Sequence, residues 1–415
     1  MTENPLSLKL RPGLEIQPIN YKGQPGLLIS DRLGLIENPV ILQGEALEVL
    51  ALIDGRREAE DIQLEFLRRK GYSLEGAGLV SKILEEFRRL LIIDSLEYRE
   101  RKQKLIQEFF ESPIRPAVLA GEAYPGKEEE LRAFIKNILG LEVISGTEER
   151  KEEIGEGREK NIKALVSPHI DLRVGSRIYS LAYRQLTGCS YERVIILGTG
   201  HFLEDGIFSL TEKDYSTPLG RVRTDKKIVR KLKEAGGELV AAHDLAHKKE
   251  HSIEFQLIFL QHLLGDNFEL IPILCGSFHQ WLTKASRASE IPGIEPFLSA
   301  LKELASAREK RTLIVAGVDL SHIGPKFGHR QRAAELKKAT LAFDDKIIEA
   351  LLRLDAVTFW RLLQETWDSF NVCGFPALAT LLEIMPAEKG YFLGYDLAEE
   401  PATQSAVSFM ALAFS

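Results

Sequence analysis

Cysteine is scarce in this chain of 415 residues, which contains only Cys189, Cys275 and Cys373. Three cysteines this far apart do not make a disulfide framework or a CxxC zinc site. Each is therefore interpreted first as a small, buried hydrophobic residue. A catalytic or metal-binding role for any of them needs support from its surroundings.

Long apolar runs and a strong charge of one sign are also lacking. No stretch approaches the roughly 20 apolar residues of a membrane-spanning helix. Residues 1–5 carry neither the basic nor the apolar region of a signal peptide. The formal net charge of −7 argues against a large nucleic-acid-binding surface. We therefore expect a cytoplasmic protein that binds neither membranes nor nucleic acid.

What remains is the composition of an ordinary globular protein, with 44% hydrophobic and 28% charged residues. A chain of this length exceeds the usual size of one hydrophobic core, so two domains are expected. A charged, helical stretch over 97–111 ends at the proline-containing segment 112–116, which marks the domain boundary. We assign residues 1–105 and 106–415 to the two domains.

Residues 1–105 have the pattern of a small α+β domain. The predicted elements are, in order, a hairpin over 27–36 that turns at Asp31-Arg32, helices over 45–53, 59–70 and 75–90, and a strand over 91–93. This order is typical of a winged-helix module.

The second domain is organised around two buried strands that each run into a histidine. Residues 164–167 lead to His169, and residues 194–199 lead to His201. Both are continuous apolar runs, which are typical of parallel strands covered by helices on both faces. A helix over 177–186 completes a strand–helix–strand unit. Further strands are predicted over 268–274, 312–318, 391–395 and 406–413. The fold class is therefore α/β, with a twisted, mainly parallel sheet flanked by helices.

The ends of these strands carry the residues that favour a functional site. Ligands of parallel sheets gather outside the carboxyl ends of the strands. We expect His169 and His201 to converge there from neighbouring strands, as a metal pair or an acid/base pair. His322 follows another predicted strand, three residues after Asp319, and could act as a base, an acid or a ligand.

Three further histidines are weaker candidates. His251 lies beside Glu250 at the start of a predicted helix. It is either catalytic or a hydrogen-bonding residue of the helix start. His243 and His247 lie in a polar loop and carry no pattern that indicates a role.

Cys373 is the informative cysteine. It lies in a Val-Cys-Gly segment just before a proline and a helix. A thiol at a helix N-terminus is favoured in its ionised form by the helix dipole, although a small residue buried in a tight turn fits the spacing equally well. Asp171, two residues beyond His169, is the alternative ligand, because His-x-Asp with a distant histidine occurs in two-histidine, one-carboxylate iron sites.

These motifs together resemble the Memo family, whose bacterial and archaeal members are called AmmeMemoRadiSam system protein B. The resemblance covers residues 115–415 in one order. It is carried by Pro116-Ala117-Val118, Pro168-His169, Ile196-Leu197-Gly198 with His201, Glu250-His251-Ser252-Ile253-Glu254, Asp319 with Ser321-His322, and Cys373-Gly374.

The resemblance implies a fold and a set of site residues. The Memo family shares its fold with the class III extradiol dioxygenases, which implies a twisted α/β sheet with a metal pocket. It implies His169, His201 and Cys373 as metal ligands, Fe(II) or copper as the cofactor, and His322 as the acid/base residue. His251 and Asp319 complete the catalytic candidates.

Partners are also implied by resemblance. The family name implies association with a radical-SAM enzyme and an AMMECR-like protein in a modification pathway. Residues 46–57, followed by Asp61-Ile62, resemble the PqqD-like peptide-recognition domains. Such domains bind a peptide as an added strand.

The sequence departs from the Memo pattern beside its ligands. Residues 170–173 read Ile-Asp-Leu-Arg where the family has Ala-Gly-Tyr, and Thr199-Gly200 replaces Pro-Ser before His201. Ile323 stands where the family has an aromatic residue. The proposed ligands are kept while the residues beside them differ, so the substrates of other family members are not assigned to this chain. Three functions stay open: a non-haem metal oxidoreductase, a non-catalytic peptide- or protein-binding module, and a metal-assisted hydrolase.

Overall fold

The computed structural model describes residues 7–31, 33–36, 38–70, 74–140 and 162–415. The chain divides into two compact units, Met1–Glu111 and Ser112–Ser415, each of which has its own core. Within the described residues, no helix is long and apolar enough to cross a lipid bilayer.

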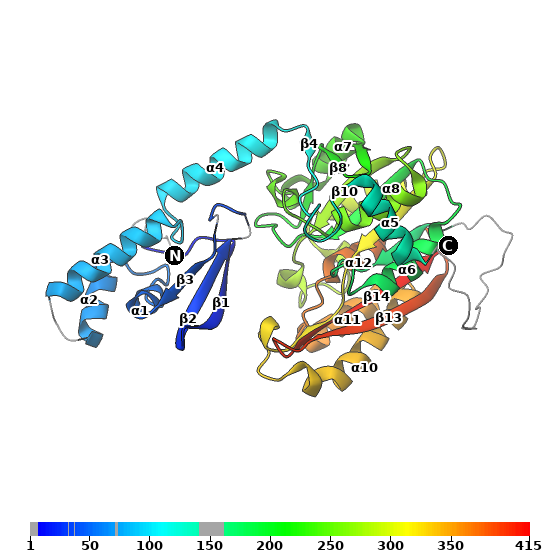
Figure 1. Cartoon of the computed structure of the whole chain (residues 1–415). Coiled ribbons are helices and arrows are strands. Elements are labelled where there is room, and N and C mark those ends of the chain that lie inside the picture. The colour runs from blue at the N-terminus through cyan, green and yellow to red at the C-terminus, as the bar shows by residue number, and fades with distance from the viewer. Residues whose placement is uncertain (1–6, 32, 37, 71–73, 141–161) are drawn as a thin grey trace. The chain divides into compact units, whose positions relative to one another are not determined.

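The first unit combines a small antiparallel sheet with helices (Figure 1). Its strands pair in the order β1 (Leu14–Tyr21), β2 (Gln24–Asp31) and β3 (Val40–Gln43). Its helices are α1 (Glu45–Leu50), α2 (Ala59–Lys70), α3 (Leu74–Arg89) and α4 (Leu96–Glu111). Residues 91–93, predicted as a strand, form an isolated bridge between Ile93 and Leu10. The described order of strands followed by helices thus differs from the order on which the winged-helix prediction rests.

The hairpin of this unit lies earlier in the chain than predicted. β2 pairs with β1, whereas residues 33–36 form a turn. The reason is Asp31, whose carboxylate accepts the backbone N–H groups of Leu33 at 3.0 Å and Ile36 at 2.9 Å. These bonds offer the backbone an alternative to strand pairing. Arg32, assigned to the predicted turn, lies outside the described residues.

The second unit is built on one large sheet. The main path of the sheet has the order β12-β14-β5-β11-β6-β10-β9-β8-β4, with β13 paired to β14 and β7 to β10. The strands are β4 (Ile114–Arg115), β5 (Ala164–Ser167), β6 (Arg193–Thr199), β7 (Phe208–Leu210), β8 (Asp214–Thr217), β9 (Gly220–Thr224), β10 (Glu269–Cys275), β11 (Thr312–Gly317), β12 (His322–Ile323), β13 (Gly390–Glu400) and β14 (Ser405–Phe414).

This sheet is mixed rather than mainly parallel. Its centre, β5-β11-β6-β10-β9, is parallel. β14 pairs antiparallel with β5, β12 and β13, and β8 pairs antiparallel with β9. β11 lies between β5 and β6, so the strands that lead to His169 and His201 are separated by a third strand instead of being neighbours.

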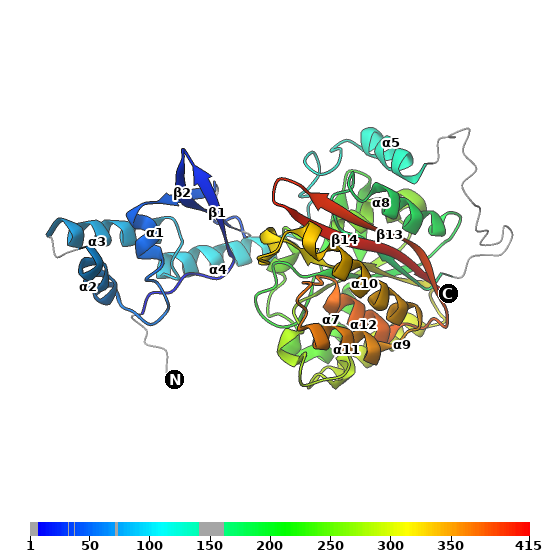
Figure 2. The ribbon, with the colours of Figure 1, turned by 90° about the horizontal axis from the view of Figure 1, so that it is seen from below.

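Helices cover both faces of this sheet, as the continuous apolar runs predict (Figures 1 and 2). Val194 and Ile196 of β6 face one core, and Ile195 and Leu197 face the other. The first core is shared with α5 (Glu128–Leu139), α6 (Ser176–Tyr183) and α8 (Glu254–Leu264). The second is shared with α7 (Lys226–Gly236), α9 (Glu295–Ser306), α10 (Ala333–Leu352), α11 (Ala356–Thr366) and α12 (Phe375–Ile384). The α/β prediction is thereby confirmed.

Candidate metal centre

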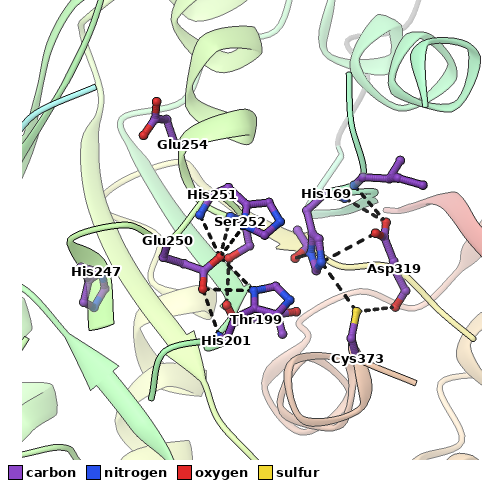
Figure 3. A network of polar contacts seen from close by, with 12 residues as sticks. His169, Thr199, His201, His247, Glu250, His251, Ser252, Glu254, Asp319 and Cys373 are labelled. Atoms are coloured by element: carbon purple, nitrogen blue, oxygen red, sulfur yellow. Dashed lines mark hydrogen bonds and ion pairs between the residues drawn. The ribbon is translucent and has the colours of Figure 1, made fainter. Parts of the chain in front are cut away.

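Three parallel strands and one helix start bring polar side chains to one end of the sheet (Figure 3). His169 lies two residues after β5, His201 two residues after β6, and Asp319 two residues after β11. Cys373 lies two residues before α12. Because the strands are parallel and adjacent in the order β5-β11-β6, their carboxyl ends open on the same side.

The atoms that could hold a metal lie close together. Nε2 of His169 is 3.6 Å from Sγ of Cys373. The ring centroids of His169 and His201 are 5.0 Å apart. One donor atom from each of these three residues falls within 4.8 Å of the other two. A tetrahedral metal bound by two imidazoles and a thiolate separates its ligand atoms by about 3.3–3.6 Å, so small side-chain movements would complete such a site.

Each of the two imidazoles is held by its Nδ1 atom. Nδ1 of His169 lies 2.9 Å from the carbonyl oxygen of Gly317. Nδ1 of His201 lies 3.1 Å from each carboxylate oxygen of Glu250. A carbonyl or a carboxylate can only accept, so Nδ1 carries the hydrogen and Nε2 carries the lone pair. Metal-binding histidines usually donate their other N–H group in this way.

Glu250 joins this cluster, although the sequence pattern gave it no role beyond its place beside His251 and in the Memo motif. It is buried and also accepts the backbone N–H groups of His201 at 3.0 Å, His251 at 2.8 Å and Ser252 at 2.9 Å. Burial alone would raise the pKa of Glu250, but its contacts with His201, His251 and Ser252 outweigh burial and hold that pKa well below its usual range. The signal that could have found it is an acidic residue directly before the predicted helix start. Its oxygens are occupied by these donors, so Glu250 orients histidines.

His251 adds a third imidazole to the cluster. Its ring centroid lies 4.9 Å from that of His201, with the rings nearly parallel, and 5.1 Å from that of His169. Its Nδ1 is 3.3 Å from Glu250. His201, Glu250 and His251 form a second group whose donor atoms lie within 4.8 Å of one another. The structure thus places His251, a candidate from its position beside Glu250, next to both strand-end histidines.

Asp319 supports His169 from the end of the intervening strand. Its Oδ1 accepts the backbone N–H groups of His169 at 3.0 Å and Ile170 at 3.3 Å, and its Oδ2 lies 3.7 Å from Nε2 of His169. Burial raises the pKa of Asp319, and the contacts with His169 oppose that rise. The backbone carbonyl of Asp319 accepts from the thiol of Cys373 at 3.5 Å. Asp319 therefore contacts two of the three proposed ligands, His169 and Cys373.

Burial also sets the protonation of the donors. It lowers the pKa values of His169 and His251 to about 4. It raises the pKa of Cys373 well above its ordinary value, and the charge of Asp319 raises it further. At neutral pH the imidazoles of His169 and His251 are therefore in the neutral form that binds metals, whereas the thiol of Cys373 must lose its proton on binding.

His322 lies outside the two groups of donor atoms. It belongs to β12, its Nδ1 donates to the carbonyl oxygen of Leu320 at 3.0 Å, and its ring packs against Phe327. Burial lowers its pKa to about 4. The structure therefore gives it a neutral ring whose Nε2 carries the lone pair, which is the form of a proton acceptor.

The remaining sequence candidates are not gathered into this site. Asp171 is exposed, and its Oδ1 accepts the backbone N–H groups of Arg173 at 2.8 Å and Val174 at 3.3 Å. Its carboxylate thus stabilises the loop that contains it, and Asp171 belongs to neither donor group. His247, placed by the sequence in a polar loop, is fully buried, with Nδ1 2.8 Å from the hydroxyl of Tyr215. His243 likewise belongs to neither donor group.

The fold and the site define an α/β protein with a candidate metal centre at the carboxyl ends of its parallel strands. Residues 115–413 match the family described as Memo-like protein. This match covers more than half of the chain, and the chain belongs to the Memo family. The resemblance stated from the motifs is confirmed.

The relatives differ in how much of this chain they cover. A MEMO1 family protein of Aquifex aeolicus is 28% identical over 96% of this chain and 98% of its own length. A MEMO1 family protein of Nitrosopumilus maritimus is 25% identical over 72% of this chain and 99% of its own length. A third, from Methanopyrus kandleri, is 30% identical over 68% of this chain and 91% of its own. The Nitrosopumilus protein is thus matched over almost its whole length by about three quarters of this chain.

Proposed function

We propose that this protein binds one redox-active metal ion, Fe(II) or copper, through His169, His201 and Cys373, and acts as a metal-dependent oxidoreductase. One observation carries the proposal: three donor atoms from distant parts of the chain lie within 4.8 Å of one another. Because Nδ1 of each imidazole donates a hydrogen bond, the lone pair on Nε2 stays available to a metal ion.

The chemistry of the donor set supports this choice of metal. A thiolate with two imidazoles suits copper and iron better than the hard cations Mg²⁺ and Ca²⁺, which prefer oxygen ligands. A bound iron or copper ion would supply one-electron redox chemistry next to the imidazoles. The chain's own residues then have the tasks of binding, orientation and proton transfer.

Each polar side chain has a defined task in this proposal. Asp319 and Glu250 hold His169 and His201 in place through the contacts described above. His322 takes the acid/base role that the family resemblance implies, and His251 is a further imidazole beside His169 and His201. Burial keeps both rings neutral at neutral pH, which is the form that can accept a proton. Glu250 and Asp319 accept backbone N–H groups beside the histidines, so this proposal gives both carboxylates an orienting role and not the role of the base in a metal-assisted hydrolase.

A second candidate function belongs to the first unit. Its three-stranded sheet has β1 and β3 as edge strands, and an edge strand can accept a peptide as an added strand. We propose that one of these two edge strands captures a peptide partner. The partner would belong to a radical-SAM-associated modification pathway that includes an AMMECR-like protein. Pull-down of the radical-SAM enzyme and the AMMECR-like protein by the full chain, but not by residues 112–415, would support this proposal. Equal capture by the truncated chain would contradict it.

The metal proposal is tested by anaerobic purification, elemental analysis and titration with Fe(II) and Cu(I). We expect about one ion per wild-type chain, and loss of that ion in His201→Ala and Cys373→Ala. Cys189→Ala is the matched control, because Cys189 is half-buried elsewhere and donates to Gln185. Wild type that stays metal-free and gains no thermal stability on titration would rule the proposal out.

A further inference from the structure

A hydrogen-bonded ion pair joins two distant segments of the chain near Cys373. Nε2 of His279 lies 2.7 Å from Oδ2 of Asp368. The Asp368 side chain is 2% exposed, whereas that of His279 is 49% exposed. The hydrogen bond that His279 donates to Asp368 raises the pKa of His279, whereas burial lowers the pKa values of His169 and His251. His279 follows β10, and Asp368 follows α11, so the pair links segments that are 89 residues apart.

The second oxygen of the same carboxylate holds the turn that carries Cys373. Oδ1 of Asp368 accepts the backbone N–H of Val372 at 2.9 Å. The backbone carbonyl of Asp368 accepts the N–H of Asn371, also at 2.9 Å. Asp368 therefore connects His279 directly to the residue that precedes the thiol.

The backbone of this turn needs such support. Trp367, Asp368 and Asn371 have φ angles of 54°, 48° and 51°. Non-glycine residues with these angles are unfavourable and persist where the surroundings hold them. Trp367 contributes little packing, since it is 74% exposed. The side-chain amide of Asn371 adds bonds to the carbonyl oxygens of His322 and Phe327, both at 3.2 Å.

We propose that Asp368, held by His279, is a positioning residue that fixes the Cys373 thiol opposite His169 and His201. Neither Asp368 nor His279 belongs to the donor groups of the metal centre, and the sequence motifs do not single out either of them. The inference rests on the metal site proposed above. It deepens that site, because it states what keeps the third ligand in register with the two histidines.

The first test needs no metal. Hydrogen exchange of the metal-free full chain is measured for wild type, His279→Ala and His279→Gln. We expect His279→Ala to speed exchange over residues 368–373 roughly tenfold, the effect of one lost hydrogen bond. His279→Gln should restore much of the protection, because its amide can donate to Asp368. Unchanged exchange in His279→Ala would overturn the proposal, and so would equal acceleration throughout α12.

A matched control comes from the other end of α12. Arg287 pairs with Glu383 through bonds of 2.9 and 2.6 Å, and Glu383 also accepts the backbone N–H of Ser289. This ion pair anchors the same helix without touching the Cys373 turn. Glu383→Gln should therefore leave exchange over 368–373 at the wild-type rate.

The second test is metal affinity, with Co(II) as the probe because a thiolate–cobalt bond gives a near-ultraviolet absorption band. We expect His279→Ala to bind Co(II) about tenfold more weakly, with a weaker band, and Glu383→Gln to match wild type. If wild type binds Co(II) and His279→Ala binds it equally well, the role of Asp368 is contradicted but the proposed function is not. Wild type that binds no metal would contradict the proposed function and this role together.

Discussion

Glu250 places each of its carboxylate oxygens 3.1 Å from Nδ1 of His201. The same side chain accepts the backbone N–H groups of His251 and Ser252, just before α8 begins. The end of β6 and the start of α8 are thus joined through one buried carboxylate. His201 cannot rotate freely while this contact lasts, and its Nε2 is held in the direction of His169.

The first prediction concerns this contact. Glu250→Gln replaces one acceptor oxygen by an NH2 group that faces N–H donors. We expect affinity for Fe(II) or Cu(I) to fall about 10- to 100-fold, as is usual when the residue that orients a metal-binding histidine is changed. The measurement is titration against a competing chelator. Asp171→Asn is the control, because Asp171 lies in its own exposed loop, and it should bind within about twofold of wild type. Metal loss in Asp171→Asn instead would restore Asp171 as a ligand.

The second prediction concerns how metal affinity depends on pH. The pKa of His169 is about 4, so this imidazole is already neutral above pH 6. The pKa of Cys373 lies well above its ordinary value, so the thiol must release a proton when it binds. Affinity should therefore rise about tenfold per pH unit between pH 6 and 8, the slope of one released proton. In Cys373→Ser the dependence should flatten; an unchanged slope there would assign the proton to another group.

The third prediction concerns stability and pH. Burial lowers the pKa values of His169 and His247 from 6.5 to about 4. The unfolded chain binds these protons more readily, so stability is full above pH 6.5 and is lost as the pH falls towards 4. Between pH 7.5 and 5.5 each histidine should cost about 1 kcal/mol. All three tryptophans, Trp281, Trp360 and Trp367, lie in the second unit, so their fluorescence during urea unfolding reports on it.

A variant isolates one of these two histidines. His247→Gln should be less stable than wild type at pH 7.5, because it disturbs the hydrogen bond with Tyr215. Its stability should nevertheless fall less steeply between pH 7.5 and 5.5. Parallel curves for the variant and wild type would show that His247 does not contribute to the pH dependence.

The fourth prediction separates His322 from the ligands. His322→Gln should bind metal within about twofold of wild type, because His322 lies outside both donor groups. Turnover of a substrate found by oxygen-uptake screening should fall about 100-fold or more, the usual effect of removing a general acid or base. A variant that loses its metal would instead make His322 a ligand.

Much of the second unit could be predicted because its pattern is local. Residues 164–167 and 194–199 are continuous apolar runs, and such runs form strands that are buried on both faces wherever they lie in a sheet. The histidines after them were therefore expected at a carboxyl edge. The first unit was predicted less well, because the side chain of Asp31 bonds to the backbone beyond it and turns the segment that was expected to form a strand.

By itself, then, the sequence determined the α/β class, the Memo family and the strand-end positions of His169 and His201, since these follow from the order of residues along the chain. Only the tertiary structure decided that β11 separates β5 from β6. It also decided that Cys373 lies 3.6 Å from His169, across 204 residues, and that Asp171 turns to its own loop. The physical reason is that hydrogen bonds and metal-ligand distances depend on which strands pair, and strand pairing is fixed by the packing of the whole core.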